Sequence, residues 1–339
     1  MAKIGIGVIG IGRMGQVYAS HVASQIDDAR LVAVADTYVP TLEAFTSKNS
    51  SVKGYVDYHD LLADPAIQGV IVATSTSTHR DVVVAAAAAG KAIFCEKPTA
   101  LTLAATDEML VAVNQAGVMF QVGFMRRFDK AYVEARRQID ADVIGEPIVV
   151  RSIGRDPFRT SLEFANPAVS GGLIVDMAIH DFDIIRWMMG DEVERVYTET
   201  ASKVYPELVE VGDVDNAMIN VRFVNDGLGN VEVSRTAGYG YDIRCTVVGT
   251  KGTLEIGYLQ ETPVLTLSKE IGVRHDVVPY FKERFGPAYT KQIEHFVDCL
   301  REGKPPKVSS ADARAALQAA IAATVSQHEQ RIVYVNEIQ

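Results

Sequence analysis

The chain has little cysteine, a single tryptophan and no excess of positive charge. Its three cysteines, Cys95, Cys245 and Cys299, are widely spaced among 339 residues and form no CxxC pair, which argues against a disulfide framework and against a zinc site. We therefore expect buried, reduced thiols and no bound metal. The net charge of -10, without a basic run interleaved with aromatic residues, disfavours a nucleic-acid partner.

Long apolar runs are also missing. The alanine-rich stretch from Val82 to Ala89 is the nearest approach to one, and it is far shorter than the roughly 18 to 20 residues that a membrane helix needs. Residues 1–3 lead directly into an apolar strand and lack the parts of a signal peptide. We expect a cytoplasmic protein without membrane contact, and the length predicts two domains.

The first forty residues carry a dinucleotide-binding pattern. An apolar run over residues 4–9 leads into the spaced glycines Gly10, Gly12 and Gly15, and a helix-compatible segment follows. In such a turn the first glycine permits the bend, the second lets backbone approach a pyrophosphate, and the third lets the helix pack against the strand. Asp36 ends the next apolar run, about 20 residues further on, where a carboxylate can bind both ribose hydroxyls. The pattern predicts a Rossmann domain that binds NAD.

NAD is favoured over NADP because the Asp36 carboxylate would repel a 2′-phosphate. Arg13 or Lys48 could hold that phosphate if the local backbone differs, so the strictness of the preference stays open.

Short apolar strands alternate with helices through the first third of the chain. Further strands are expected at residues 31–35, 54–56, 69–73, 92–95 and 119–122. This alternation predicts a parallel, doubly wound sheet, in which ligands lie beyond the carboxyl ends of the strands. The residues that we expect to bind the cofactor there are Gly10, Gly12, Arg13, Met14, Asp36, Thr74, Thr76, His79, Glu96 and Lys97.

Beyond Phe128 the pattern changes to an alternation typical of half-buried antiparallel strands. Strands are expected at residues 147–153, 193–203, 216–223, 229–235, 243–248 and 253–256, with a helix over about 172–189, later helices over 289–301 and 310–328, and a closing strand over 331–335. We thus expect an α/β Rossmann domain over residues 1–124 and an α+β domain with an open, mostly antiparallel sheet over residues 125–339. The terminal helix and strand could pack back on the first domain. The uncovered face of the sheet predicts a homo-oligomer, a dimer or a homotetramer, formed through that sheet.

The helix over residues 172–189 carries the residues best suited to proton transfer. Asp176, His180 and Asp183 are spaced i, i+4 and i+7, along one face of an α-helix. A histidine beside carboxylates has its ring oriented and its imidazolium form favoured, as a general base acting on an alcohol requires. The alternatives are a metal-binding pair, for which no third ligand is evident, and a buried structural contact.

Two motifs together resemble the glucose-fructose oxidoreductase/inositol dehydrogenase/rhizopine-catabolism (Gfo/Idh/MocA) family over nearly the whole chain. They are Glu96-Lys97-Pro98 after a Rossmann strand and Asp176-x-x-x-His180-Asp181 on a later helix. The stretches 123–129 and 239–243 resemble the inositol 2-dehydrogenase branch in particular.

The resemblance implies a catalytic set of Lys97, Asp176 and His180. Lys97 would donate hydrogen bonds to the reacting oxygen, His180 would take the hydroxyl proton, and Asp176 would hold a neighbouring hydroxyl. The Lys97-Pro98 peptide of the family is often cis. The further substrate contacts that it implies are Arg127, Asp156 and Tyr239.

The chain departs from that branch in two places, which leaves the favoured polyol isomer open. Asp156 stands where the branch has asparagine, and Gly171-Gly172 replaces bulkier residues ahead of Asp176. We expect an NAD-dependent dehydrogenase that oxidises a secondary hydroxyl of a cyclic polyol, with myo-inositol to keto-inositol as first choice. The alternatives are a sugar or anhydrosugar dehydrogenase on the same scaffold, a redox-neutral glycosidase that uses NAD, and a non-catalytic sensor, which the complete catalytic set disfavours.

Overall fold

The computed structural model describes residues 2–339, which divide into two compact units. The first contains the residues up to Met125 together with Pro287–Arg314, and the second contains Arg126–Gly286 with Ala315–Gln339. All three cysteines are buried and unpaired, as the sequence predicts. Within residues 2–339 no helix combines the length and the apolar character needed to cross a membrane.

The first unit is built on the predicted parallel sheet. Its strands are β1 (Ile4–Ile9), β2 (Ala29–Ala35), β3 (Lys53–Tyr55), β4 (Gly69–Val72), β5 (Ala92–Cys95) and β6 (Phe120–Val122). They run parallel in the order β3-β2-β1-β4-β5-β6. Apolar side chains such as Val8, Ile71 and Phe94 have no exposed surface. Because the strand order reverses between β1 and β4, the loops after these two strands flank the place where doubly wound sheets bind ligands.

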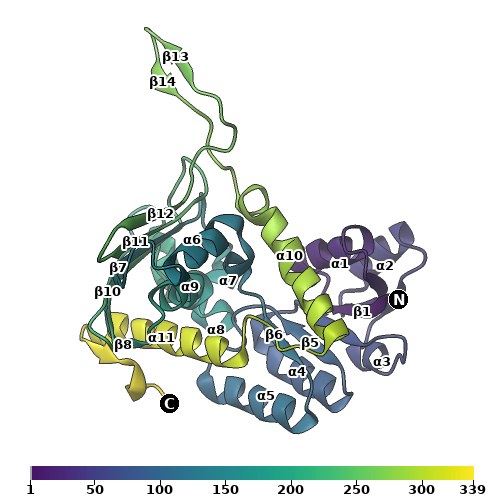
Figure 1. The fold of residues 1–339 in the computed structure, drawn as a ribbon. Coiled ribbons are helices and arrows are strands. Elements are labelled where there is room, and N and C mark those ends of the chain that lie inside the picture. The colour runs from purple at the N-terminus through teal and green to yellow at the C-terminus, as the bar shows by residue number, and fades with distance from the viewer. Residues whose placement is uncertain (1) are drawn as a thin grey trace. The chain divides into compact units, whose positions relative to one another are not determined.

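Helices follow most of these strands, as the alternation predicts (Figure 1). They are α1 (Arg13–Ser24), α2 (Val39–Lys48), α3 (Tyr58–Leu62), η1 (Thr76–Thr78), α4 (His79–Ala88) and α5 (Leu103–Ala116). Later in the chain, α10 (Phe281–Glu302) begins eight residues earlier than expected and contains Pro287. Phe281 and Phe285 are buried, so apolar burial outweighs the backbone hydrogen bond that proline cannot make.

The second unit is built on a seven-stranded sheet in the order β12-β11-β7-β10-β9-β8-β15. The strands are β7 (Pro147–Arg155), β8 (Val193–Ala201), β9 (Asn216–Phe223), β10 (Leu228–Ser234), β11 (Asp242–Gly249), β12 (Thr253–Gly257) and β15 (Val333–Tyr334). All neighbours are antiparallel except β7 and β10, which run parallel. The mostly antiparallel sheet predicted from the alternation is therefore confirmed.

Helices cover one face of this sheet (Figure 1). The unit contains η2 (Met125–Phe128, with its first residue in the other unit), α6 (Lys130–Asp140), α7 (Leu162–Ala165), α8 (Pro167–Ser170), the π-helical segment η3 (Ile174–Ala178), α9 (Ile179–Met189), η4 (Pro206–Val211), most of α11 (Ser310–Glu329) and η5 (Val335–Glu337). Helix α9 packs on β7. Positions that alternate with the buried ones expose apolar side chains, among them Val149 and Met218.

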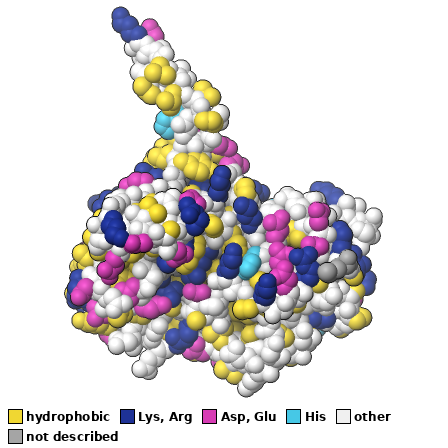
Figure 2. Space-filling model, viewed as in Figure 1, with side chains coloured by type: hydrophobic (Ala, Val, Ile, Leu, Met, Phe, Trp, Pro, Cys, Tyr) yellow, Lys and Arg dark blue, Asp and Glu magenta, His cyan; other side chains and the backbone are white. Residues whose placement is uncertain are grey.

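A two-stranded ribbon in this unit escaped sequence prediction. Strands β13 (Thr266–Ser268) and β14 (Gly272–Arg274) form a hairpin that projects away from the seven-stranded sheet (Figure 1). Apolar side chains lie along it in the open (Figure 2), and Leu267 and Val273 are 70% and 66% exposed. Three-residue strands that bury so little leave no strong pattern in the sequence.

Candidate active site

The glycine turn of the first unit has the geometry that its spacing predicts. Gly10 has φ +83°, and a Cβ there would lie 2.8 Å from the backbone nitrogen of Thr74. A Cβ on Gly15 would lie 1.8 Å from the carbonyl oxygen of Gly10, so the helix could not approach the strand. A Cβ on Gly12 would meet nothing within 4 Å. The fold therefore requires glycine at positions 10 and 15, whereas Gly12 leaves open space beside the turn.

The start of α1 is suited to an anion. Gly12 precedes its first residue and makes no side-chain cap, and the first turn carries no acidic residue. The first backbone N–H groups of a helix have no partner within the helix and carry the positive end of its dipole. Together with the space beside Gly12, this arrangement fits the pyrophosphate of NAD. Arg13 is exposed and Met14 is half-buried at the same turn.

Asp36 follows β2 and is held against the glycine turn. Its Oδ2 accepts a hydrogen bond from the backbone N–H of Ile11 at 2.8 Å, and its Oδ1 accepts one from Tyr38 at 2.8 Å. The carboxylate is half-buried. Each oxygen keeps further acceptor capacity, so the fixed carboxylate can still receive ribose hydroxyls.

The loop after β4 contains the predicted residues Thr74, Thr76 and His79. The Thr78 hydroxyl donates to the Thr74 hydroxyl at 2.8 Å, and Thr76 is half-buried. The ring of buried His79 joins two loops, with Nε2 3.1 Å from the Thr74 carbonyl oxygen and Nδ1 3.0 Å from that of Pro98. Burial lowers the pKa of His79. The imidazole braces the loops that follow β4 and β5.

Glu96 fixes the backbone at the predicted catalytic lysine. Its Oε1 accepts the Tyr18 hydroxyl, and its Oε2 accepts the Lys97 N–H at 3.0 Å. Burial raises the pKa of Glu96. Tyr18 in turn accepts a hydrogen bond from the Gln292 side chain at 2.9 Å. Sequence reasoning missed Tyr18 and Gln292, because no local pattern connects residues so far apart.

Lys97 itself is half-buried, directly after β5. The Lys97-Pro98 peptide is cis, as the resemblance implies.

In the second unit, the segment that carries Asp176 and His180 differs from the predicted regular α-helix. Residues Ile174–Ala178 form a π-helical turn, and the α-helix proper begins at Ile179. Such turns frequently occur at functional sites. Asp176 lies in the π turn, where its Oδ2 accepts a hydrogen bond from Arg235 at 3.2 Å. His180 is half-buried in the first turn of α9.

The expected placement of Asp176, His180 and Asp183 on one helix face stays a prediction, because Asp176 lies in the π turn whereas His180 and Asp183 lie in α9. Asp183 is buried and receives two hydrogen bonds from Arg127, at 2.9 Å from Nε and 2.6 Å from Nη2. Arg127 also lies over the ring of Trp187, 5.5 Å from its centroid. A π turn closes i→i+5 rather than i→i+4 hydrogen bonds, so the spacing i, i+4 and i+7 alone does not fix the side on which Asp176 lies.

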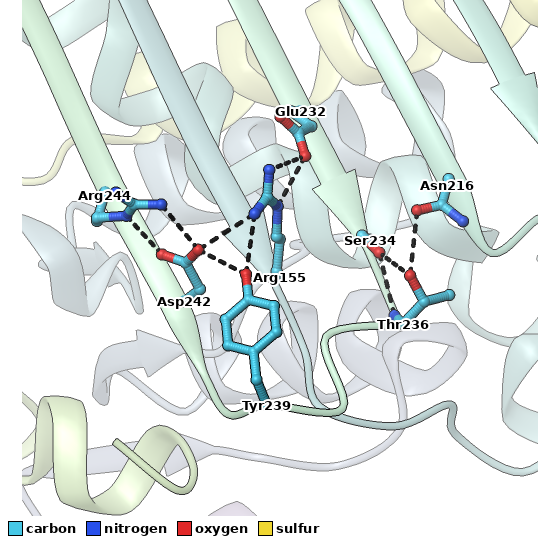
Figure 3. Close-up of polar contacts among 8 residues, drawn as sticks. All are labelled: Arg155, Asn216, Glu232, Ser234, Thr236, Tyr239, Asp242 and Arg244. Atoms are coloured by element: carbon cyan, nitrogen blue, oxygen red, sulfur yellow. Dashed lines mark hydrogen bonds and ion pairs between the residues drawn. The ribbon is translucent and has the colours of Figure 1, made fainter. Parts of the chain in front are cut away.

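Asp156 directly follows β7, and Tyr239 lies in the turn between β10 and β11. Arg155 donates to the Tyr239 hydroxyl at 2.9 Å, and that hydroxyl donates to Oδ2 of Asp242 at 2.8 Å (Figure 3). Partial burial raises the pKa of Tyr239. Asp156 is half-buried, and its backbone N–H donates to the Ser234 carbonyl at 2.8 Å.

The clusters around Tyr239 and Asp176 belong to opposite faces of the sheet. A Cβ on Gly154 would lie 2.9 Å from the Asp181 carboxylate, so even-numbered positions of β7 face α9 and Arg155 faces away. On β10 and just beyond it, Arg235 follows the buried positions of Val231 and Val233, on the helix-covered side. The hydroxyl of Tyr239 is thus tied to the other side of the sheet from the Asp176 carboxylate.

The ten predicted cofactor residues all lie in the first unit, and Arg127, Asp156, Asp176, His180 and Tyr239 lie in the second. That the side chains of Lys97 and His180 lie close together at one substrate stays a prediction. Within residues 2–339 there is no group of three or more His, Cys, Asp or Glu side chains arranged to hold a metal ion.

Both parts of the chain match models of one oxidoreductase family. Residues 4–124 match its NAD-binding Rossmann fold, and residues 136–336 match its C-terminal alpha/beta domain. Among curated proteins, the chain is 40% identical to scyllo-inositol 2-dehydrogenase (NAD(+)) of Bacillus subtilis, over 94% of this chain and 92% of that one. It is also 40% identical to myo-inositol 2-dehydrogenase of Thermotoga maritima, over 98% of this chain and 99% of that one.

Solved structures resemble the fold throughout. A probable dehydrogenase from Thermotoga maritima superposes with a TM-score of 0.95 at 38% identity, covering 99% of this chain and 100% of the other. Scyllo-inositol dehydrogenase from Lactobacillus casei, with bound NAD(H) and scyllo-inositol, gives a TM-score of 0.94 at 29% identity, with 98% and 99% covered.

Proposed function

The chain belongs to the Gfo/Idh/MocA oxidoreductase family and is an NAD-dependent oxidoreductase, and from this premise we propose that it oxidises a secondary hydroxyl of an inositol to the ketone. The observation that carries the proposal is its 40% identity, over nearly the full length, to two inositol 2-dehydrogenases. The first unit would hold NAD and the second the polyol. The domain boundary expected near residue 124 is part of this proposal.

In the proposed reaction, each protein group has one role. His180 takes the hydroxyl proton as the C–H bond of the same carbon breaks. Lys97 donates a hydrogen bond to the oxygen on which negative charge develops, which lowers the barrier without a metal ion. Asp176 accepts a hydrogen bond from a neighbouring hydroxyl and orients the ring. When bound, NAD accepts the hydride, so that the products are the ketone, NADH and a proton.

The other predicted substrate contacts have different support. Asp156 directly follows β7, and its carboxylate stands where the inositol 2-dehydrogenase branch has the amide of an asparagine. Tyr239 and Arg127 already have partners in Arg155, Asp242 and Asp183. We keep Asp156 as a proposed direct contact, whereas Arg127 and Tyr239 would act through the residues that they hold, since the Tyr239 hydroxyl lies on the other side of the sheet from Asp176.

A substrate panel tests the proposal. The purified protein is mixed with NAD and with myo-inositol, scyllo-inositol, aldoses or anhydrosugars, and NADH is followed by its absorbance. We expect NADH with an inositol at the highest kcat/KM, and the two equally similar relatives make the myo and scyllo isomers the first to compare. A higher kcat/KM with a sugar or anhydrosugar would replace the inositol proposal with that alternative. No NADH from any polyol or sugar, with cleavage of glycosides, would replace it with the redox-neutral glycosidase.

We also propose that the protein assembles through its seven-stranded sheet. The exposed Val149 and Met218 on the face away from α9 support this, because a partner subunit would bury them. Sedimentation equilibrium tests it, with a homotetramer or dimer expected and a monomer contradicting it. The cytoplasmic location stays a prediction.

A further inference from the structure

A buried arginine contacts the carboxylate that the proposed reaction uses. The Arg235 side chain is 2% exposed. Its Nη1 donates to Oδ2 of Asp213 at 2.7 Å, and its Nη2 donates to Oδ2 of Asp176 at 3.2 Å. The Asp213 side chain is 3% exposed and that of Asp176 is 19% exposed. One guanidinium thus lies between two carboxylates, of which the Asp176 carboxylate is the more exposed.

Asp213 also fixes the start of the π turn. Its Oδ1 accepts the backbone N–H of Leu173 at 2.7 Å, and Leu173 directly precedes Ile174–Ala178. A Cβ on Gly172, where φ is +70°, would lie 2.8 Å from that same oxygen. Gly172, one of the two glycines that distinguish this chain from the inositol dehydrogenase pattern, therefore makes room for Asp213.

The backbone at Arg235 is held from both sides. Its own N–H donates to the Asp215 carbonyl at 2.9 Å. The neighbouring hydroxyls of Ser234 and Thr236 lie 2.8 Å apart, and Thr236 donates to the Asn216 side chain at 3.3 Å (Figure 3). The guanidinium thus starts from a fixed position, which limits the movement of the carboxylate that it contacts.

We propose that Arg235, anchored by Asp213, is a positioning residue that sets the orientation of the Asp176 carboxylate toward the substrate. This inference rests on the role of Asp176 in the proposed function. A displacement of about 1 Å at a group that orients substrate can lower the rate about 100-fold. Arg235 and Asp213 can therefore affect catalysis through Asp176, without a contact to the substrate.

The test removes the buried pair together. Arg235→Met alone would leave Asp213 charged and unpaired, whereas Arg235→Met with Asp213→Asn removes both charges. For this pair variant we expect kcat/KM for inositol to fall about 100-fold. A rise in KM would show that Asp176 orients the bound substrate, and a fall in kcat would show that Asp176 acts in the transition state. The NADH dissociation constant, measured by fluorescence, should change less than about 2-fold, because Arg235 lies outside the cofactor unit.

Arg235→Lys should restore part of the loss, since lysine keeps the charge but cannot bridge two carboxylates with a planar fork. We expect kcat/KM about 10-fold below wild type for this variant. If the pair variant does not fold, Arg235→Lys decides: wild-type kcat/KM with an unchanged melting temperature would overturn the proposal. A folded pair variant with wild-type kcat/KM would overturn it equally.

A double-mutant cycle separates positioning through Asp176 from a general effect on structure. Adding Asp176→Asn to the pair variant should cost no more than about a further 3-fold, because Asp176 has already lost the contact that positions it. The inference would be contradicted if the fold-losses in kcat/KM of Asp176→Asn and of the pair variant multiplied in the combined variant. Arg186→Lys is the matched control, since Arg186 on α9 also pairs with a carboxylate, that of Glu192 beyond the end of the helix; it should keep kcat/KM within about 2-fold.

The cycle also distinguishes the two proposals. Full activity of Asp176→Asn, or no polyol activity of the wild type, would refute the proposed function and the inference together. Loss of activity in Asp176→Asn with full activity in the folded pair variant would refute only the positioning role of Arg235.

Discussion

The two units present their candidate groups in different physical ways. In the first unit the site is built largely of backbone: a glycine turn, a helix start and loops after β1 and β4, to which Asp36, Glu96 and Lys97 add charge. In the second unit it is made of charged side chains that are buried and paired, such as Arg235 with Asp213 and Arg127 with Asp183. Added side-chain volume should therefore impair the site of the first unit most. Altered charge or hydrogen bonding should impair the site of the second unit most.

The largest effect should follow a change in the second unit. His180→Asn removes the proposed base and keeps a similar size. We expect kcat to fall about 10²- to 10⁴-fold, the range for a lost general base, with NADH affinity unchanged. Steady-state kinetics and fluorescence titration measure the two quantities. His328→Asn, at an exposed histidine, is the control and should match wild type. A His180→Asn enzyme with wild-type kcat would remove this residue from the mechanism.

Volume in the first unit should have the next largest effect. Gly15→Ala places a methyl group 1.8 Å from the Gly10 carbonyl oxygen, so the free energy of unfolding should fall by about 1–3 kcal/mol or more. Gly12→Ala meets no neighbouring atom, so its melting temperature should equal that of wild type while its NADH affinity falls about 10-fold. Thermal melts and fluorescence titration separate the two variants. Equal melting temperatures for Gly15→Ala and Gly12→Ala would contradict the backbone account.

A single charge in the first unit should set cofactor preference. Asp36→Ser removes the carboxylate that would repel a 2′-phosphate. The ratio of kcat/KM for NADP to that for NAD should rise about 10-fold or more, which corresponds to about 1.4 kcal/mol. Asp27→Ser, at an exposed aspartate two residues before β2, should leave the ratio unchanged. An unchanged ratio in Asp36→Ser would move the determinant to Arg13 or Lys48.

The smallest effect concerns acid stability. Burial depresses the pKa of His79, so the unfolded chain binds a proton at this residue at a higher pH than the folded chain does. The folded state therefore loses stability as the pH falls below the unfolded value of about 6.5 toward the depressed folded pKa. In His79→Gln the melting temperature should change less between pH 7 and pH 5 than in wild type. An identical pH dependence would show that His79 does not titrate in this way.

The same contrast explains what the sequence could reveal. The strands of both sheets follow from local periodicity, and β5 was predicted at its observed bounds. The glycine turn was predictable because each glycine meets a constraint within its own strand-turn-helix unit. Asp36 was predictable for the same reason.

Groups paired across long distances in the chain left no such signal. Arg235 looked like the end of a strand, and nothing near it in sequence indicates contact with Asp176, 59 residues away. The π turn was missed because its residues fit an α-helix equally well, and the hydrogen bond at its start joins Leu173 to Asp213, 40 residues away. The parallel pairing of β7 with β10 is likewise a property of the assembled sheet.

Transfer of deuterium tests the central claim most directly. The wild-type protein is incubated with NAD and with inositol that carries deuterium on the carbon to be oxidised, and the reduced cofactor is examined by proton NMR. Direct hydride transfer predicts one deuterium at C4 of the nicotinamide for each ketone formed, together with a slowed rate under conditions where the chemical step limits turnover. Reduced cofactor without deuterium, or ketone formed without reduced cofactor, would contradict the account.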